Sequence, residues 1–159
     1  MPVHEPMVLM RRAPSGLNPG RLEEFARTLR RRVTGGREFQ CLITGDGELQ
    51  RLNREFRRKD YPTDVLSFPA GPSVRNKAPK GALAAVSIGD IAISVDRARA
   101  QAREFGHTVD HEICILMLHG VLHLMGMDHE RDGGDMARAE TEWRRKLGLP
   151  SALIERVGA

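Results

Sequence analysis

The residues best suited to chemistry in this 159-residue chain are three histidines in the segment HGVLHLMGMDH, namely His119, His123 and His129. Two imidazoles four residues apart lie on one face of a helix, about one turn apart along its axis. Gly126 can end that helix and let the chain turn back, which would bring His129 toward the other two side chains. Neutral imidazole is a good zinc ligand, and three protein ligands with one open position are typical of catalytic zinc. The sequence therefore predicts one zinc ion per chain at these histidines.

A purely structural role is the alternative for each histidine. A single histidine on an apolar helix is usually a core residue that is hydrogen-bonded to a neighbour. Residues 113–124 are apolar on nearly every side of the predicted helix, so three buried imidazoles would each need a separate polar partner. One metal ion satisfies all three, and for this reason we favour metal binding.

The same histidine spacing occurs in zinc peptidases, but one catalytic residue of those enzymes is missing. In the peptidase signature HExxHxxGxxH, the glutamate after the first histidine is the general base. Gly120 occupies that position here, and no downstream methionine turn is identifiable. A metallopeptidase or a metallohydrolase of another class would therefore need a base from elsewhere in the fold.

Other polar residues near the motif are weaker candidates. His107 and His111 are also four residues apart, but they flank Asp110 near a helix start, and we expect them to be exposed polar residues. Glu112 lies on nearly the same face as His119, yet two helical turns, about 10 Å, prevent it from sharing the ion directly.

Two further residues have competing interpretations. Asp128 can hold a ligand histidine in one tautomer or simply form a turn, and both remain open. Trp143 lies with Leu147 on an amphipathic helix, so packed core is favoured over a base-stacking platform.

Hydrophobic periodicity and turn residues divide the chain into short strands and helices. Strands are predicted at residues 7–12, 38–44, 64–68 and 90–94, and helices at 17–33, 45–57, 95–106, 107–126 and 134–148. Asn18 and Asp46 are the predicted starts of the first two helices, and a glycine closes each of the last three. Residues 69–89 contain three prolines and three glycines, which predicts an exposed loop in at least the first half. The pattern indicates an α+β fold, a single domain over residues 1–159 with a small mixed sheet covered by helices.

The amino-acid composition indicates which kind of partner the protein binds and in which cellular compartment it is found. The chain has 25 basic and 21 acidic residues, a formal charge of +4 and a sequence pI near 9.6. This balance favours an anionic partner, nucleic acid above all, although 21 of the basic residues are arginine and compositional bias explains that equally well. Cys41 and Cys114 both lie in apolar runs and are expected to be buried in a reducing compartment. Without a long apolar stretch, we expect a cytoplasmic protein with no membrane anchor.

Four segments together resemble the YbeY family of bacterial rRNA-maturation endoribonucleases. They are the histidine motif, FRRKDYPTDVLSFP (56–69), GDIAIS (89–94) and MARAETEWRRKLGLP (136–150). The resemblance spans about residues 38–150. It implies a zinc-dependent, single-strand-specific endoribonuclease that matures the 3′ end of 16S rRNA and acts in ribosome quality control. Implied partners are single-stranded RNA, the ribosome and ribosome-assembly factors.

The resemblance also assigns roles to individual residues. By position, His119, His123 and His129 match the zinc ligands of the family, and Arg57 matches its functional arginine. Met127 stands where an aromatic residue is common, and the segment RDGGDMARAE is poor in acidic residues. Neither difference affects a ligand, so only the surface around the site is expected to differ.

This assignment is chemically reasonable for hydrolysis of a phosphodiester. Zinc lowers the pKa of a bound water to about 7 and polarises a phosphoryl oxygen, while arginine offers two parallel donors to phosphate. Arg57, expected before the strand at 64–68, could instead form a surface salt bridge with Glu55 or Asp60. Water and the RNA 2′-hydroxyl both remain possible nucleophiles. A non-catalytic, ribosome-associated RNA-binding zinc protein is a further alternative.

Overall fold

A four-stranded mixed sheet forms the centre of the computed structural model, which describes residues 6–11, 16–61, 63–70, 87–127 and 133–150. The strands are β1 (Val8–Met10), β2 (Glu38–Thr44), β3 (Val65–Pro69) and β4 (Ser87–Ser94), in the spatial order β1-β2-β4-β3. β1, β2 and β4 are parallel, whereas β3 runs antiparallel to β4 at the edge. This confirms the predicted α+β class and the small mixed sheet.

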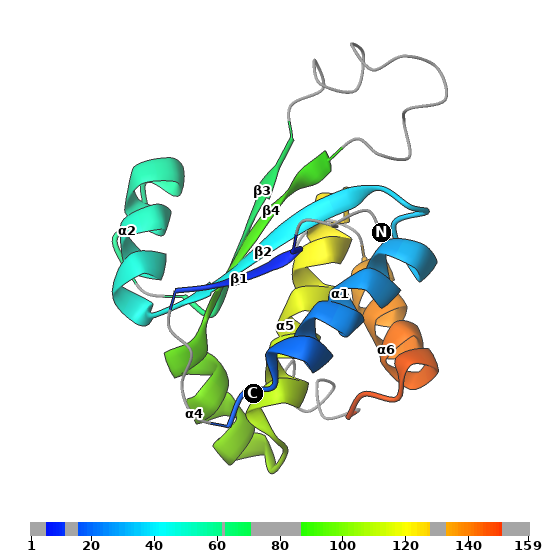
Figure 1. Ribbon diagram of the computed structural model, residues 1–159. Helices are drawn as coiled ribbons and strands as arrows, with labels where there is room; N and C mark the ends of the chain where they lie inside the picture. The colour runs from blue at the N-terminus through cyan, green and yellow to red at the C-terminus, as the bar shows by residue number, and fades with distance from the viewer. Residues whose placement is uncertain (1–5, 12–15, 62, 71–86, 128–132, 151–159) are drawn as a thin grey trace.

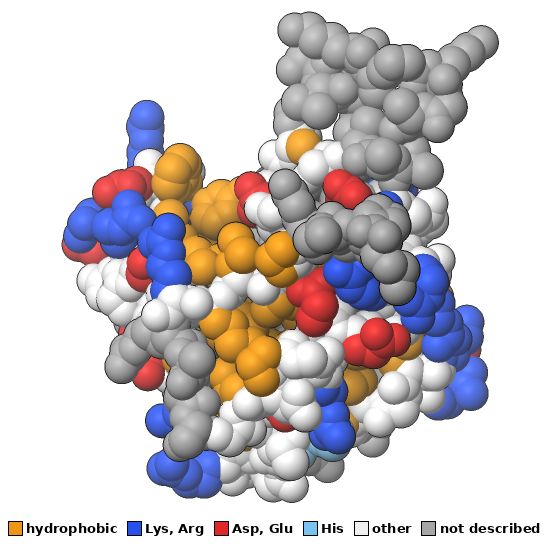
Figure 2. Space-filling view, viewed as in Figure 1, with side chains coloured by type: hydrophobic (Ala, Val, Ile, Leu, Met, Phe, Trp, Pro, Cys, Tyr) orange, Lys and Arg blue, Asp and Glu red, His pale blue; other side chains and the backbone are white. Residues whose placement is uncertain are grey.

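Helices cover the two faces of the sheet unequally (Figure 1). They are α1 (Pro19–Arg32), α2 (Asp46–Arg57), α4 (Val95–Phe105), α5 (Val109–Leu124) and α6 (Asp135–Leu147). α5 packs on β3 and β4, and α1 and α6 lie beside it, whereas α2 stands on the opposite face of the same strands. The space-filling view shows a strip of exposed apolar side chains on the α2 side of the sheet (Figure 2). Leu9 of the edge strand β1 is 43% exposed.

The helix boundaries agree closely with those predicted, and most of the caps do too. The side chain of Asn18 accepts a hydrogen bond from the backbone N–H of Arg21, which confirms the predicted start of α1. Gly106 and Gly148 are the C-caps of α4 and α6, as predicted, and both have a left-handed backbone conformation. α5 ends at Leu124, before Gly126. The predicted start of α2 at Asp46 is confirmed, because Asp46 is the first helical residue and Gly45 is the N-cap.

The start of β4 was not recognisable from the pattern of the sequence. β4 begins at Ser87 rather than at residue 90, so the end of the predicted loop is strand, while residues 71–86 lie outside the described residues. Gly89 interrupts the apolar pattern because the backbone of β3 comes very close to it. A Cβ atom at Gly89 would lie 2.3 Å from the carbonyl oxygen of Phe68, and its φ of +141° is a conformation that L side chains rarely adopt.

The main core lies between the sheet and α5, whose residues from Ile113 to Leu118 are all buried. Cys41 and Cys114 are free thiols in this core, which confirms the prediction that both behave as small buried apolar residues. Burial raises the pKa of the Cys114 thiol to about 12 and also raises the pKa of Cys41 strongly. In the described part of the chain, no helix combines the length and apolar character needed to cross a membrane.

Candidate metal centre

His119 and His123 lie side by side on the second half of α5. Their Nε2 atoms are 3.1 Å apart, and their ring centroids are 4.7 Å apart. Both side chains are half-buried, while the residues between them are buried. The apolar sequence places α5 at the centre of the fold, and the four-residue spacing then directs both imidazoles to one place. The structure therefore brings together two of the three predicted ligands.

A buried carboxylate from another helix contacts this pair. Glu140 of α6 is 4% exposed, and its Oε1 atom is hydrogen-bonded to Nδ1 of His119. Sequence reasoning missed Glu140, although a signal was available. Glu140 follows Met136 by one helical turn on the apolar face of α6, and a carboxylate on such a face requires a polar partner.

The geometry of the pair is compatible with a zinc ion. Two nitrogen ligands of a tetrahedral zinc ion, each bound at 2.0–2.1 Å, are separated by about 3.3 Å. The observed Nε2–Nε2 distance of 3.1 Å is close to that value. The Nδ1 contact of His119 with a carboxylate is also what zinc-binding histidines commonly show. Within the described ranges, no group of three candidate ligands is found, and the predicted residues His129 and Asp128 lie outside those ranges.

The chain turns back directly after α5. The backbone N–H of Gly126 donates to the carbonyl of His123, and that of Met127 donates to the carbonyl of Leu122. Gly126 has a φ of +95°, which favours glycine in this turn. The predicted turn is thus present at the position from which the chain continues to His129.

Gly120 is required by close packing between α5 and β4. A Cβ atom at this position would lie 2.9 Å from Cγ2 of Ile91. Ser67 of β3 donates a hydrogen bond of 3.0 Å to the carbonyl of Gly120, which ties the edge strand to the same turn of the helix. A glutamate therefore does not fit at the position that supplies the base in HExxH peptidases.

The prediction that His107 is exposed is wrong. Its side chain is only 7% exposed, and its Nε2 atom lies 2.6 Å from Oε1 of Glu112, whose side chain is fully buried. The buried carboxylate needs this partner because it lies among apolar residues near the start of α5. His111 is half-buried at the same helix start. Glu112 thus contacts His107, and its exclusion from the metal site of His119 stays a prediction.

Arg57 is the last residue of α2 and is exposed. The two carboxylates proposed as its alternative salt-bridge partners are paired with other arginines, Glu55 with Arg51 and Asp60 with Arg54. The structure therefore does not support the salt-bridge alternative. α2, which ends at Arg57, packs on β3 and β4, the two strands on which the histidine-bearing α5 also packs.

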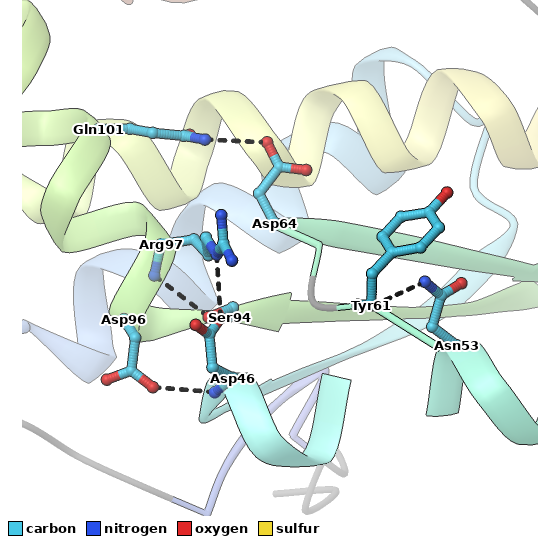
Figure 3. A network of polar contacts seen from close by, with 8 residues as sticks. All are labelled: Asp46, Asn53, Tyr61, Asp64, Ser94, Asp96, Arg97 and Gln101. Carbon is cyan, nitrogen blue, oxygen red and sulfur yellow. Dashed lines mark hydrogen bonds and ion pairs between the residues drawn. The ribbon is translucent and has the colours of Figure 1, made fainter. Parts of the chain in front are cut away.

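A polar network holds the two ends of α2 in place (Figure 3). At its start, the Asp46 carboxylate accepts hydrogen bonds from Ser94 at 2.7 Å and from Nε of Arg97 at 3.3 Å. Near its end, the buried Asn53 side chain donates to the backbone carbonyl of Tyr61 at 2.9 Å. These contacts fix α2 relative to the sheet, and with it the position of Arg57.

These features define a small α+β protein whose candidate site is a carboxylate-oriented histidine pair on a central buried helix. The family model described as Endoribonuclease YbeY matches residues 21–148, and the chain belongs to this family. The chain is 59% identical over 150 residues to a Solibacter usitatus (strain Ellin6076) protein named Endoribonuclease YbeY, covering 94% of this chain and 93% of that relative.

Further comparisons agree with this membership. A Koribacter versatilis (strain Ellin345) protein of the same name is 49% identical over 151 residues, covering 94% of this chain and 91% of that relative. The solution structure of TM1509 from Thermotoga maritima is similar in fold, with a TM-score of 0.56 and 25% sequence identity. The similarity covers 88% of this chain and 93% of that structure.

Proposed function

We propose that this protein is a zinc-dependent, single-strand-specific endoribonuclease that matures the 3′ end of 16S rRNA and acts in ribosome quality control. The observation that carries the proposal is the pair of Nε2 atoms 3.1 Å apart on α5, with Glu140 bonded to the other nitrogen of His119. The relatives named as endoribonucleases support RNA as the substrate. The rRNA step and the partners, which are the ribosome and its assembly factors, follow from the resemblance to the family. The cytoplasmic location is proposed from the two cysteines in apolar runs and the lack of a long apolar stretch in the sequence.

Each residue of the site has a defined task in this proposal. His119, His123 and His129 would hold the zinc ion, which when bound supplies an activated water and polarises a phosphoryl oxygen. Arg57 would bind a phosphate oxygen through its two parallel N–H donors and stabilise charge that develops there. Since Gly120 leaves no room for a peptidase-type glutamate, this arrangement favours a phosphodiester substrate over a peptide.

The first prediction concerns the metal. The purified protein should contain about one zinc ion per chain, and the double variant His119→Ala, His123→Ala should contain almost none, because two of three ligands are removed. Elemental analysis of the dialysed proteins measures this. His111→Ala, at the start of the same helix, is the matched control and should keep the ion. Full zinc occupancy in the double variant would contradict the assignment of the ligands.

Catalysis is tested by cleavage of a single-stranded RNA that contains the 3′ region of precursor 16S rRNA. The parent should cut this RNA, lose activity with a chelator and regain it with added zinc, while a duplex of the same sequence should stay intact. Zinc-loaded protein that binds the RNA without cutting it would instead indicate a non-catalytic RNA-binding zinc protein.

A further inference from the structure

We propose that Glu140 is a positioning residue for the metal centre, which holds His119 as the tautomer with the proton on Nδ1. The inference rests on the proposed function only for the identity of the ion. In this proposal α6, and not only the histidine-bearing α5, determines how readily the site binds metal.

The contact between Glu140 and His119 determines which imidazole nitrogen of His119 carries the proton. An ionised carboxylate can only accept hydrogen bonds, so its bond to Nδ1 of His119 requires the imidazole proton to be on Nδ1. In a neutral imidazole the other nitrogen then carries the lone pair. Nε2 of His119 is the atom that lies 3.1 Å from Nε2 of His123. The nitrogen left free of a proton is therefore the one that faces the second ligand.

Burial strengthens the preference of this contact for one tautomer of His119. The side chain of Glu140 is 5% exposed and that of His119 is 26% exposed, so water competes little for the carboxylate. A hydrogen bond to a charged group is stronger than a neutral one, and leaving a buried charge without it is costly. The Nδ1–H tautomer of His119 is thus favoured before any ion is bound.

The position of Glu140 is set by packing of α6. Its buried residues Met136, Glu140 and Arg144 follow one another at four-residue intervals and form one face of the helix. α6 contacts α5, and Trp143 and Leu147 of α6 pack against the main core. The carboxylate is therefore placed by the helix interface, independently of the metal. Such outer partners of zinc-binding histidines commonly change metal affinity by about 10- to 100-fold when they are replaced.

The test compares Glu140→Gln with Glu142→Gln. Glu142 lies on the same helix but is exposed and paired with Arg145, so it is a matched control for loss of a carboxylate. In metal-free protein, ¹⁵N NMR of the imidazole rings should show His119 as the Nδ1–H tautomer in the parent and in Glu142→Gln. In Glu140→Gln both tautomers should be populated, because an amide can either accept from Nδ1–H or donate to Nδ1.

Zinc affinity is the second readout, measured by competition with a chromophoric chelator. Glu140→Gln should bind zinc about tenfold or more weakly than the parent, whereas Glu142→Gln should match the parent. Thermal unfolding of the metal-free proteins shows whether each variant is folded. If Glu140→Gln does not fold, Glu140→Asp takes its place, since it keeps the charge but is one methylene too short for the same contact.

The two possible failures are distinguishable. A folded Glu140 variant with the parent's tautomer and the parent's zinc affinity would overturn the positioning role. A parent protein that takes up no zinc would instead contradict the proposed function, and the tautomer measurement in the metal-free protein would still decide the role of Glu140.

Discussion

At the scale of single residues, Arg57 is the side chain whose role in catalysis can be separated most cleanly from folding. It is exposed at the end of α2 and is a member of neither apolar cluster. We therefore expect Arg57→Ala to keep the zinc content and thermal stability of the parent. RNA cleavage should slow by about a hundredfold, because a donor to the transition state is lost. Arg57→Lys should recover only part of the rate, since a point charge cannot reproduce two parallel donors.

Arg51→Ala is the matched control for this experiment. Arg51 is exposed on the same helix and forms an ion pair with Glu55 at 2.9 Å. Its loss should leave the cleavage rate near that of the parent, and because exposed ion pairs contribute little, stability should hardly change. If Arg57→Ala unfolds readily, or cuts RNA as fast as the parent, Arg57 has a structural or incidental role.

At the scale of the elements, the contact between α5 and β4 controls the geometry of the histidine pair. Gly120 lies between the two histidines, and a methyl group there would meet Ile91 at 2.9 Å. Replacing glycine by alanine inside a helix normally stabilises a protein by up to about 1 kcal/mol. For Gly120→Ala we expect the opposite sign, a loss of about 1–3 kcal/mol in the free energy of unfolding, because the core is overpacked.

Urea denaturation measures this change, and Gly47→Ala is the control. Gly47 lies in α2, where an added Cβ atom would meet no atom within 4 Å, so this variant should be as stable as the parent or slightly more so. Ile91→Val removes one of the three contacting atoms and should reduce the cost of Gly120→Ala in a double-mutant cycle. A stabilising Gly120→Ala would show that α5 does not approach β4 this closely.

At the scale of the whole molecule, the relevant property is a modest excess of positive charge. The formal charge is +4, and several arginines are already paired with carboxylates, including Arg11 with Glu48 and Arg97 with Asp46. In the view of Figure 2, lysine and arginine side chains lie over α2 beside the apolar strip, with acidic side chains among them, and a further basic group lies along the right-hand edge. This distribution suits an anionic, flexible partner such as single-stranded RNA.

We expect the affinity for a single-stranded RNA to fall steeply as salt rises, because counterions are released when the protein contacts phosphates. Fluorescence anisotropy with a labelled oligonucleotide at about 50 to 200 mM salt measures the slope. Arg57→Ala should reduce that slope by about one unit if Arg57 contacts a phosphate. Affinity that does not change with salt would mean that the arginines reflect compositional bias.

Local patterns along the chain were sufficient to predict the helices, most of the strands and part of the site. Strand 38–44 was predicted with the boundaries that the structure has, and the helices agree within a few residues, because periodicity and capping depend on residues close in the chain. The pairing of His119 with His123 was predicted for the same reason, since four residues make one helical turn. Family membership was also recognisable, because the motifs that carry it are short continuous segments.

Contacts between residues far apart in the chain could not be predicted in this way. The strand order β1-β2-β4-β3, with β3 antiparallel, has no local signal because it depends on how the helices pack on the sheet. The bond between His119 and Glu140 spans 21 residues, and the contact of Gly120 with Ile91 joins a helix to a strand. Patterns along the chain show that a carboxylate is buried or that a glycine is required. They do not show the partner, because the partner is chosen by three-dimensional packing of the whole core.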